Sequence, residues 1–330
     1  MSGYLARNRS IILAYLGVLL LLAVTTIYSP GYLSESSLRS SLVLAAFVGI
    51  VALGQTFVII GGGIDLSVPW VLNSSAVLMA VLCAGQDLPF IWVLPSIMIA
   101  AALLGALNGI GIAVFGIPAI IMTLGVNVIL QGLIVIYTGG RPTPPAPEVV
   151  RFLSVGRIGP VPVVLILWVA LGVAASWLLS KTAFGRYVYA VGSNATVAEF
   201  SGVPSARTTI TTYVLSSVSA ALAGILLTGY SGQAYLGMGD PYLFTSIAAV
   251  AIGGASILGG SGHYVGTVAG ALVLTILSGL LPALGLSTGA LMIVYGAVIL
   301  LTVSMGSDAL GGAWRAVFRW SGRKTDGTKS

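Results

Sequence analysis

The stretch LVLAAFVGIVALGQTFVIIGGGIDLSVP, residues 42–69, combines a membrane-length apolar run with an abrupt break. Its first part, residues 42–61, carries no charge and has the length of about 20 residues that a helix needs to cross a bilayer. Three glycines end the run, and a single carboxylate, Asp65, follows them shortly before Pro69. The stretch therefore predicts a transmembrane helix that stops at a glycine-rich turn, with the next helix beginning near Pro69.

The composition of the whole chain agrees with a membrane protein. Of its 330 residues, 57% are hydrophobic and only 7% are charged, and the mean hydropathy is +1.07. Soluble domains contain roughly 25% charged residues. The apolar runs are long and show little strand-like alternation, so helices are expected rather than a barrel. We predict an all-α integral membrane protein.

Ten apolar stretches are long enough to be spans. They cover residues 11–28, 42–61, 68–84, 89–107, 118–138, 161–180, 209–229, 242–258, 265–282 and 287–305. Glycine-rich letters separate the fourth from the fifth (NGIGIAVFG, 108–116) and the eighth from the ninth (GGSGH, 259–263), so one of these pairs contains a broken or re-entrant helix. The first stretch resembles a signal peptide but is longer than an h-region, and we expect it to be retained.

Basic residues predict the orientation. They gather before the first span, after the sixth and in the tail, which ten spans place on one side, and the positive-inside rule makes that side cytoplasmic. These residues are Arg7, Arg9, Lys181, Arg186, Arg207, Arg315, Arg319, Arg323, Lys324 and Lys329. An external loop with Arg141, Arg151 and Arg157 is the exception. We predict a transmembrane domain over residues 11–306 between a cytoplasmic segment (1–10) and a basic cytoplasmic tail (307–330), and no nucleic-acid partner for the net charge of +6.

Asp65 is the one carboxylate beside a span interior. The other acidic residues are expected in loops or tails: Glu35, Asp87, Glu148, Glu199, Asp240, Asp308 and Asp326. So few buried charges argue against a proton relay, although Asp65 remains the coupling group of an alternative ion-driven carrier. We interpret it as a charge at a helix start, with Ser67 as a capping candidate. Gly62, Gly63, Asp65 and Ser67 then form a helix break close to an inner gate.

Uncharged polar residues inside the spans are candidates for a translocation path. They are Gln55, Asn73, Asn108, Asn127 and Gln131. Amides can hydrogen-bond a polyhydroxylated solute without the desolvation cost of a charge. Hydrogen bonds between helices are the alternative interpretation of each of them.

The sequence gives little indication of a catalytic site. GGSG (259–262) matches the GxSG of intramembrane serine proteases, and His263 follows Ser261 by two residues, but side chains at i and i+2 do not face each other on a helix. There is no GxxxxGK[ST] sequence, so ATP needs a partner protein. We predict no catalytic residue, no metal site and no cofactor bound by this chain.

The longest internal polar stretch, residues 181–209, follows the sixth predicted span. Residues 194–201 predict a short helix with Asn194 as N-cap and Glu199 in its body, ended by Gly202 and Pro204. Such a helix is either a tether between spans or a docking surface for a soluble partner.

Four ordered motifs carry a family resemblance over residues 40–305: GGGIDLSVP, GALNGIGIAVFGIPAIIMTLG, TAFGRYVYAVGSNATVAEFSGV and SIAAVAIGGASILGGSGHYVGTVAGAL. Together they resemble the permease subunits of bacterial ABC (ATP-binding cassette) importers for monosaccharides, of the ribose and xylose type. Branched-chain amino-acid permeases are more distant relatives and provide an alternative substrate class. The chain departs from the family pattern at Pro69, at residues 195–198 and at His263.

The resemblance implies the ABC importer permease fold in the bacterial inner membrane, with a second permease chain, in a homodimer. It also implies a separate ATPase subunit that holds ATP and Mg, and a periplasmic sugar-binding protein. The polar stretch then becomes the ATPase-coupling loop, with contact residues Gly185, Arg186, Gly192, Asn194, Glu199, Ser201 and Gly202. The chain itself is expected to be a transport subunit and not an enzyme.

Overall fold

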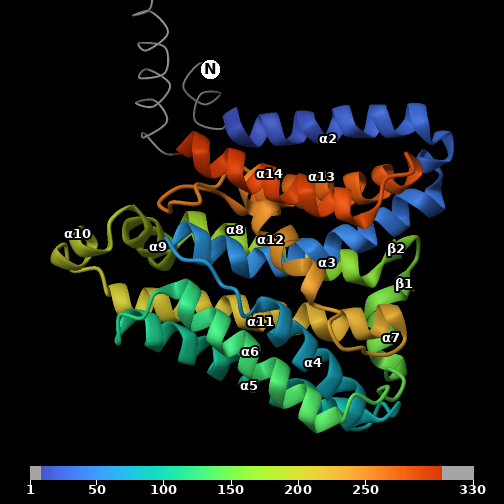
Figure 1. Ribbon diagram of the computed structural model, residues 1–330, viewed down its shortest axis with the longest axis horizontal. Helices are drawn as coiled ribbons and strands as arrows, with labels where there is room; N and C mark the ends of the chain where they lie inside the picture. The colour runs from blue at the N-terminus through green and yellow to red at the C-terminus, as the bar shows by residue number, and fades with distance from the viewer. Residues whose placement is uncertain (1–8, 307–330) are drawn as a thin grey trace, which may run out of the picture.

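The computed structural model describes residues 9–306 and consists almost entirely of helices (Figure 1). The elements are α2 (Arg9–Tyr28), η1 (Pro30–Leu33), α3 (Glu35–Ile60), α4 (Val68–Cys83), α5 (Phe90–Ala113), α6 (Ala119–Thr138), α7 (Glu148–Val155), β1 (Arg157–Ile158), β2 (Val161–Pro162), α8 (Val163–Lys181), α9 (Ala183–Ser193), α10 (Ala195–Phe200), α11 (Ser205–Ser231), α12 (Asp240–Ile252), α13 (Tyr264–Ala283) and α14 (Thr288–Gly306). The predicted segment before residue 9 and the predicted tail lie outside the described residues.

Each of the ten predicted spans coincides with a helix. Seven helices have the length and hydropathy of a membrane span: α2, α3, α5, α6, α8, α11 and α13. Helices α4 and α12 are apolar but shorter, with 16 and 13 residues, and α14 is the tenth. The expected all-α membrane fold is confirmed.

Helix α3 forms the centre of the bundle. Its apolar window is 94% buried, whereas only 17% of the windows of α2 and α5 are buried. It packs against α8, α11, α12 and α13, which separate it from the outer helices (Figure 1). The apolar outer faces of α2, α5 and α6 suit contact with lipid, because lipid chains are as apolar as these side chains.

The two short helices begin inside the bundle. Each follows a non-helical segment, residues 61–67 before α4 and residues 232–239 before α12, and each has proline in its first turn. Their starts meet, because a Cβ at Gly239 would collide with the carbonyl oxygen of Pro69. The series α3–α4–α5–α6 and α11–α12–α13–α14 thus share one plan, long helix, break, short helix and two spans, and they enter the bundle from opposite ends (Figure 1).

Glycines allow helix α11 to approach its neighbours closely. A Cβ at Gly105 of α5 would lie 2.6 Å from the Cα of Val214, and one at Gly109 would lie 2.5 Å from the Cα of Ile210. At Gly224 the added atom would collide with the carbonyl oxygen of Leu72 in α4. Small residues at such crossings bring backbones into van der Waals contact, which drives helix association in lipid.

This packing excludes residues 108–116 as the place of the broken helix and leaves the other predicted place, residues 259–263. Helix α5 continues to Ala113, because Gly109 and Gly111 serve close packing, against Ile210 and Met122, rather than a turn. The chain turns only at residues 114–118. The broken helix is instead α12, which ends at Ile252 before the loop that contains GGSGH.

The polar loops also differ from the expectation. The predicted external loop that holds Arg141, Arg151 and Arg157 contains the short helix α7, which packs against α11. Glu35, Glu148 and Asp240 lie in the first turns of α3, α7 and α12 rather than in loops. A carboxylate at a helix start is stabilised by the helix dipole.

The Gly224 crossing gives a test of the packing. Gly224→Ala should destabilise the protein by about 1–3 kcal/mol, because the new methyl group has to displace the backbone of α4. The midpoint temperature of the detergent-solubilised protein, followed by loss of the monodisperse elution peak, measures this. Gly125→Ala on α6, where the added atom meets only open space, is the matched control and should change little. Equal midpoints for the two variants would contradict the close crossing.

Candidate functional site

The extended segment at residues 61–67 is bound by side chains from three surrounding helices. Thr123 of α6 accepts the N–H of Leu66 at 3.0 Å, and Tyr213 of α11 donates its hydroxyl to the carbonyl of Ile64 at 3.4 Å. Asn108 of α5 donates to the Ser67 hydroxyl at 2.9 Å. Backbone groups away from water need such partners, so these side chains hold an otherwise costly non-helical segment inside the bundle.

Asp65 is completely buried in this segment. One carboxylate oxygen, Oδ1, accepts the N–H of Ser67 at 2.9 Å and its hydroxyl at 2.5 Å. The other oxygen, Oδ2, has no hydrogen-bond partner among the described residues. The ion pairs of that part of the chain, Glu35 with Arg39 and Glu148 with Arg151, lie elsewhere. Asp65 therefore fixes the turn before α4 without a neutralising cation in the described chain.

The start of α4 differs in one detail from the prediction. Ser67 occupies the N-cap position, but its side chain makes no capping bond to the helix. Its hydroxyl is held by Asp65 and Asn108 instead, which leaves it unable to reach the first helical N–H groups. Asn127 of α6 accepts the N–H of Trp70 at 3.3 Å, and Pro69 lies in the first turn as predicted.

The second non-helical segment, residues 232–239, is held by the same kind of contact. Asn73 of α4 donates to the carbonyl of Tyr235 at 2.8 Å. Thr143, from the loop before α7, accepts the N–H of Ala234 and donates to its carbonyl. We call residues 61–67 and 232–239 the two breaks. They are linked through α4, because α4 begins at the first break and its Asn73 amide binds the second.

The structure brings together three of the five predicted path amides. Asn73 and Asn108 contact the two breaks and are fully buried, and Asn127 binds Trp70 in the first turn of α4. Gln55 is also fully buried, on α3, and neither of its amide atoms has a partner among the described residues. Gln131 is exposed on α6. The orphaned amide and carboxylate oxygens make the neighbourhood of the breaks suited to water or a polar solute.

The two breaks and the polar side chains that bind them form a polar zone, and two clefts approach it from opposite ends. A cleft of about 450 Å³ at the α9–α10 end is lined by Gly62, Gly63, Glu199 and Tyr213 among others. A cleft of about 230 Å³ on the other side is lined by residues such as Tyr235 and Tyr242 of the second break and of α12. The first break contributes Gly62 and Gly63 to one cleft, and the second contributes Tyr235 to the other.

Helices α9 and α10 project from one end of the molecule (Figure 1). The predicted short helix is confirmed as α10, and Asn194 caps it by accepting the N–H of Val197 at 3.0 Å. Arg186 and Glu199 are exposed, whereas Gly185 is buried and Gly202 takes the left-handed conformation (φ +81°) that ends the helix. Ser201 donates to the carbonyl of Val197 at 2.8 Å.

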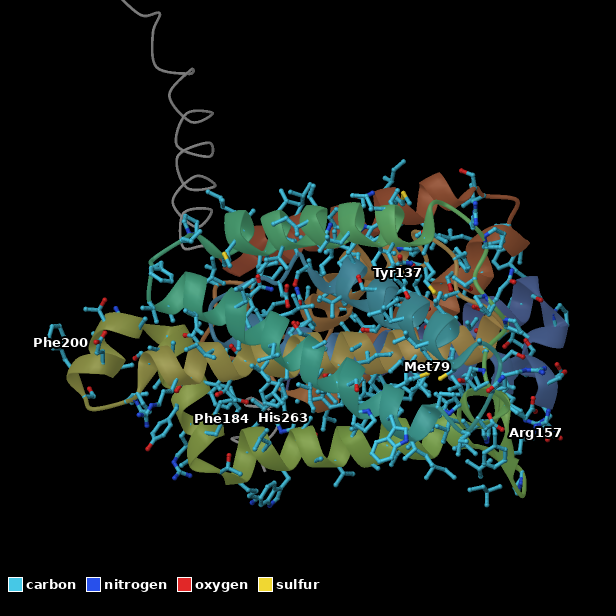
Figure 2. The ribbon with its side chains drawn as sticks, turned by 90° about the horizontal axis from the view of Figure 1, so that it is seen from below. Met79, Tyr137, Arg157, Phe184, Phe200 and His263 are labelled. Atoms are coloured by element: carbon cyan, nitrogen blue, oxygen red, sulfur yellow. The ribbon has the colours of Figure 1, made fainter. Side chains whose placement is uncertain are left out.

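Sequence analysis missed Phe200 in this projection. Its side chain is 89% exposed and points outward at the tip of α10 (Figure 2). It was overlooked because one aromatic residue in a short helix has no distinctive pattern. Thr123, Tyr213 and Thr143 were missed because their hydrogen-bond partners are distant in the sequence.

The geometry around Ser261 does not support hydrolysis. His263 caps α13 by accepting the N–H of Val265 on Nδ1 at 3.2 Å, and burial lowers the pKa of its imidazole, which favours the neutral acceptor form. No hydrogen bond joins Ser261 to His263 in the described chain. Among the same residues, no group of three metal-binding side chains occurs.

Comparisons with known proteins identify the family. Residues 37–303 match the family described as the branched-chain amino acid transport system / permease component. The chain belongs to this permease family. The permease is 32% identical over 294 residues to the ribose import permease protein RbsC of Haemophilus influenzae, with 88% of this chain and 91% of the relative covered.

Other relatives of the permease point in the same direction. It is 36% identical over 308 residues to the ribose import permease protein RbsC of Bacillus subtilis, covering 88% of this chain and 90% of that one. The autoinducer 2 import system permease protein LsrC of Escherichia coli O157:H7 is 35% identical over 282 residues, covering 83% and 80%. No solved structure gave a significant match. The permease is thus a multi-pass membrane transport subunit, as the four sequence motifs indicate.

The Asp65 contacts give a second test. Asp65→Leu should lower stability by about 1–3 kcal/mol, because it leaves the Ser67 N–H and hydroxyl buried without an acceptor. Asp65→Asn retains an acceptor oxygen of the same shape and should cost less, without changing which solute is carried. Thermal midpoints of the purified variants measure the difference. Equal losses for the two variants would show that the hydrogen bonds at Oδ1 are unimportant.

Proposed function

We propose that the permease imports a monosaccharide as the membrane subunit of an ATP-binding cassette system. The observation that carries this proposal is the α9–α10 projection. Its tip exposes Phe200, Val197 and Glu199 beside the cleft of about 450 Å³. An apolar side chain exposed on a capped helix outside the membrane suits burial in a partner protein. In this arrangement the α9–α10 projection docks on an ATPase subunit, and movement of the projection determines which of the two clefts is open.

The remaining parts of the system follow from this assignment. ATP and Mg are bound by the ATPase subunit, and the permease makes and breaks no covalent bond. The α9–α10 end is cytoplasmic, which agrees with exposed Lys181, Arg186 and Arg207 there. Both termini are then cytoplasmic, and the α7 end receives solute from a periplasmic binding protein. A second copy of the permease completes the transport unit in the inner membrane.

The substrate class is supported by the chemistry of the polar zone. Its path candidates are uncharged amides, which suit hydroxyl groups, together with the acidic Asp65. A branched-chain amino acid carries a carboxylate, and no basic side chain contacts the two breaks in the hydrogen bonds of the described residues. The ribose and autoinducer 2 permeases among the relatives also favour a sugar-like solute.

An ion-driven carrier that uses Asp65 is the alternative. The Oδ1 atom of Asp65 is engaged by Ser67, so the carboxylate is better placed to shape the break than to exchange ions with a cleft. The two functions differ in their energy source, which is ATP for one and an ion gradient for the other. Uptake by the reconstituted permease distinguishes them.

Uptake in proteoliposomes tests the proposal directly. The permease reconstituted with its ATPase subunit and binding protein should accumulate radiolabelled D-ribose when ATP is present inside. The permease alone should not accumulate it down an imposed proton or sodium gradient. Gradient-driven uptake without the ATPase would contradict the proposal, and ATP-driven uptake of leucine in place of ribose would overturn the substrate class.

Phe200 tests the docking surface. Phe200→Ala should reduce co-purification of the ATPase subunit at least tenfold while membrane insertion is unchanged, because it removes the exposed apolar anchor of α10. Phe152→Ala is the matched control, since Phe152 is an exposed aromatic residue on α7 at the opposite end. Glu199→Ala and Arg186→Ala should weaken association less. Normal assembly of the Phe200 variant would exclude α10 as the docking element.

A further inference from the structure

Three glycine-containing segments meet beneath the α9–α10 projection. They are the end of α3 with Gly62, the last turn of α9 with Gly192, and the loop after α12 with Gly259 and Gly260. A Cβ at Gly259 would lie 2.6 Å from the carbonyl oxygen of Gly192 and 2.8 Å from the Cα of Gly62. We call these four residues the glycine junction. Its members touch through backbone atoms with no side chain between them.

Hydrogen bonds hold the three segments in this contact. The N–H of Gly260 donates to the carbonyl of Ile60 at 2.9 Å, which joins the loop to α3. The hydroxyl of Tyr189 in α9 donates to the carbonyl of Gly262 at 2.7 Å, which joins the loop to α9. At Gly192 even a methyl group would collide with the carbonyl oxygen of Ile60, and it would lie 2.7 Å from the N–H nitrogen of Gly260. Gly192 is therefore the tightest point of the contact.

Both broken helices are connected to the glycine junction. Gly62 leads through the extended segment into α4, and Gly259 follows α12 in the chain. Helix α12, with 13 residues, is about 20 Å long and reaches from this loop to the start of α4, where Gly239 contacts Pro69. Because a helix is a stiff element, a displacement of the loop along α12 reaches the contact between the two breaks (Figure 1).

The chemistry of the contact favours movement. Interdigitated side chains resist sliding because packed interiors have few voids, whereas backbones in glycine contact present a smooth surface. Gly62 (φ +85°) and Gly259 (φ +91°) also occupy the left-handed region, where other residues are strained. Such positions absorb backbone rotation at low cost, as hinge residues do.

We infer that the glycine junction transmits movement of α9–α10 to both broken helices, with Gly192 as the positioning residue. This inference rests on the proposed function and adds to it the place at which a conformational change of the ATPase subunit is passed to the membrane domain. It requires the last turn of α9 to shift against the loop after α12 during every transport cycle. A static packing contact would not need to shift.

A reversible cross-link separates these two cases. Ser193→Cys combined with Gly260→Cys places a thiol pair across the junction, because a Cβ at Gly260 would lie 2.6 Å from the Ser193 hydroxyl oxygen. At Gly260 the added atom meets the movable Ser193 side chain first, whereas at Gly192 it meets the backbone of α3, so the reduced double variant should retain a measurable part of the uptake. Oxidation should lower that uptake at least tenfold while the ATPase stays bound, and reduction should restore it to its starting value in the same sample. The native Cys83 is buried in α4 and takes no part.

Ile158→Cys with Val161→Cys is the matched control. This pair faces across the β1–β2 ladder at the opposite end, and its oxidation should leave uptake unchanged. Full uptake by the oxidised junction pair would overturn the inference, and failure of that pair to cross-link would overturn the contact itself.

Gly192→Ala provides a second measurement. It should abolish uptake but retain association of the ATPase, because α10 remains intact, and normal uptake by this variant would also overturn the inference. Absence of uptake by the unmodified permease with its partners would instead refute the proposed function, so the two failures are distinguishable.

Discussion

The structure depends on one constraint: backbone N–H and C=O groups inside a bilayer need hydrogen-bond partners within the protein. Residues 61–67 run through the bundle without forming a helix. Thr123 and Tyr213 bind their backbone groups and Asn108 binds the Ser67 hydroxyl, from three different helices. Asp65 supplies a fourth partner from within the segment. The arrangement of α5, α6 and α11 around α4 follows from the need to serve this one stretch of backbone.

Satisfying that constraint places polar side chains inside the bundle. Some atoms of the side chains that stabilise the two breaks remain without partners among the described residues, namely Asp65 Oδ2, Asn73 Oδ1 and Asn108 Oδ1, and both amide atoms of the buried Gln55 on α3 are likewise without partners. Residues of the two breaks line two separate clefts. In the proposed function a solute with several hydroxyl groups binds here, because amides both donate and accept hydrogen bonds.

Glycine acts in two distinct ways in this chain. Within the helices, residues such as Gly105, Gly109 and Gly224 allow backbones to approach each other and form a rigid crossing. At the glycine junction the same close approach joins the last turn of α9 to two segments that are not helical and that contain glycines in the left-handed region, Gly62, Gly259 and Gly260. One residue type thus provides both the fixed frame and, in our inference, the mobile contact between the ATPase-facing projection and the membrane domain.

The sequence alone determined the helical membrane class, the positions of the ten apolar helices and the capped helix α10, because apolar run length and capping chemistry are local properties. It also identified Asp65, Asn108 and Asn127 as unusual. Only the tertiary structure decided that α12 is broken and that α5 continues through residues 108–113, since a glycine in a turn and a glycine in a close crossing look the same in a sequence. The partners of the breaks were equally hidden: Asn73 meets Tyr235, and Gly192 meets Ile60, across more than a hundred residues. Such contacts arise from packing between distant segments, which no local pattern encodes.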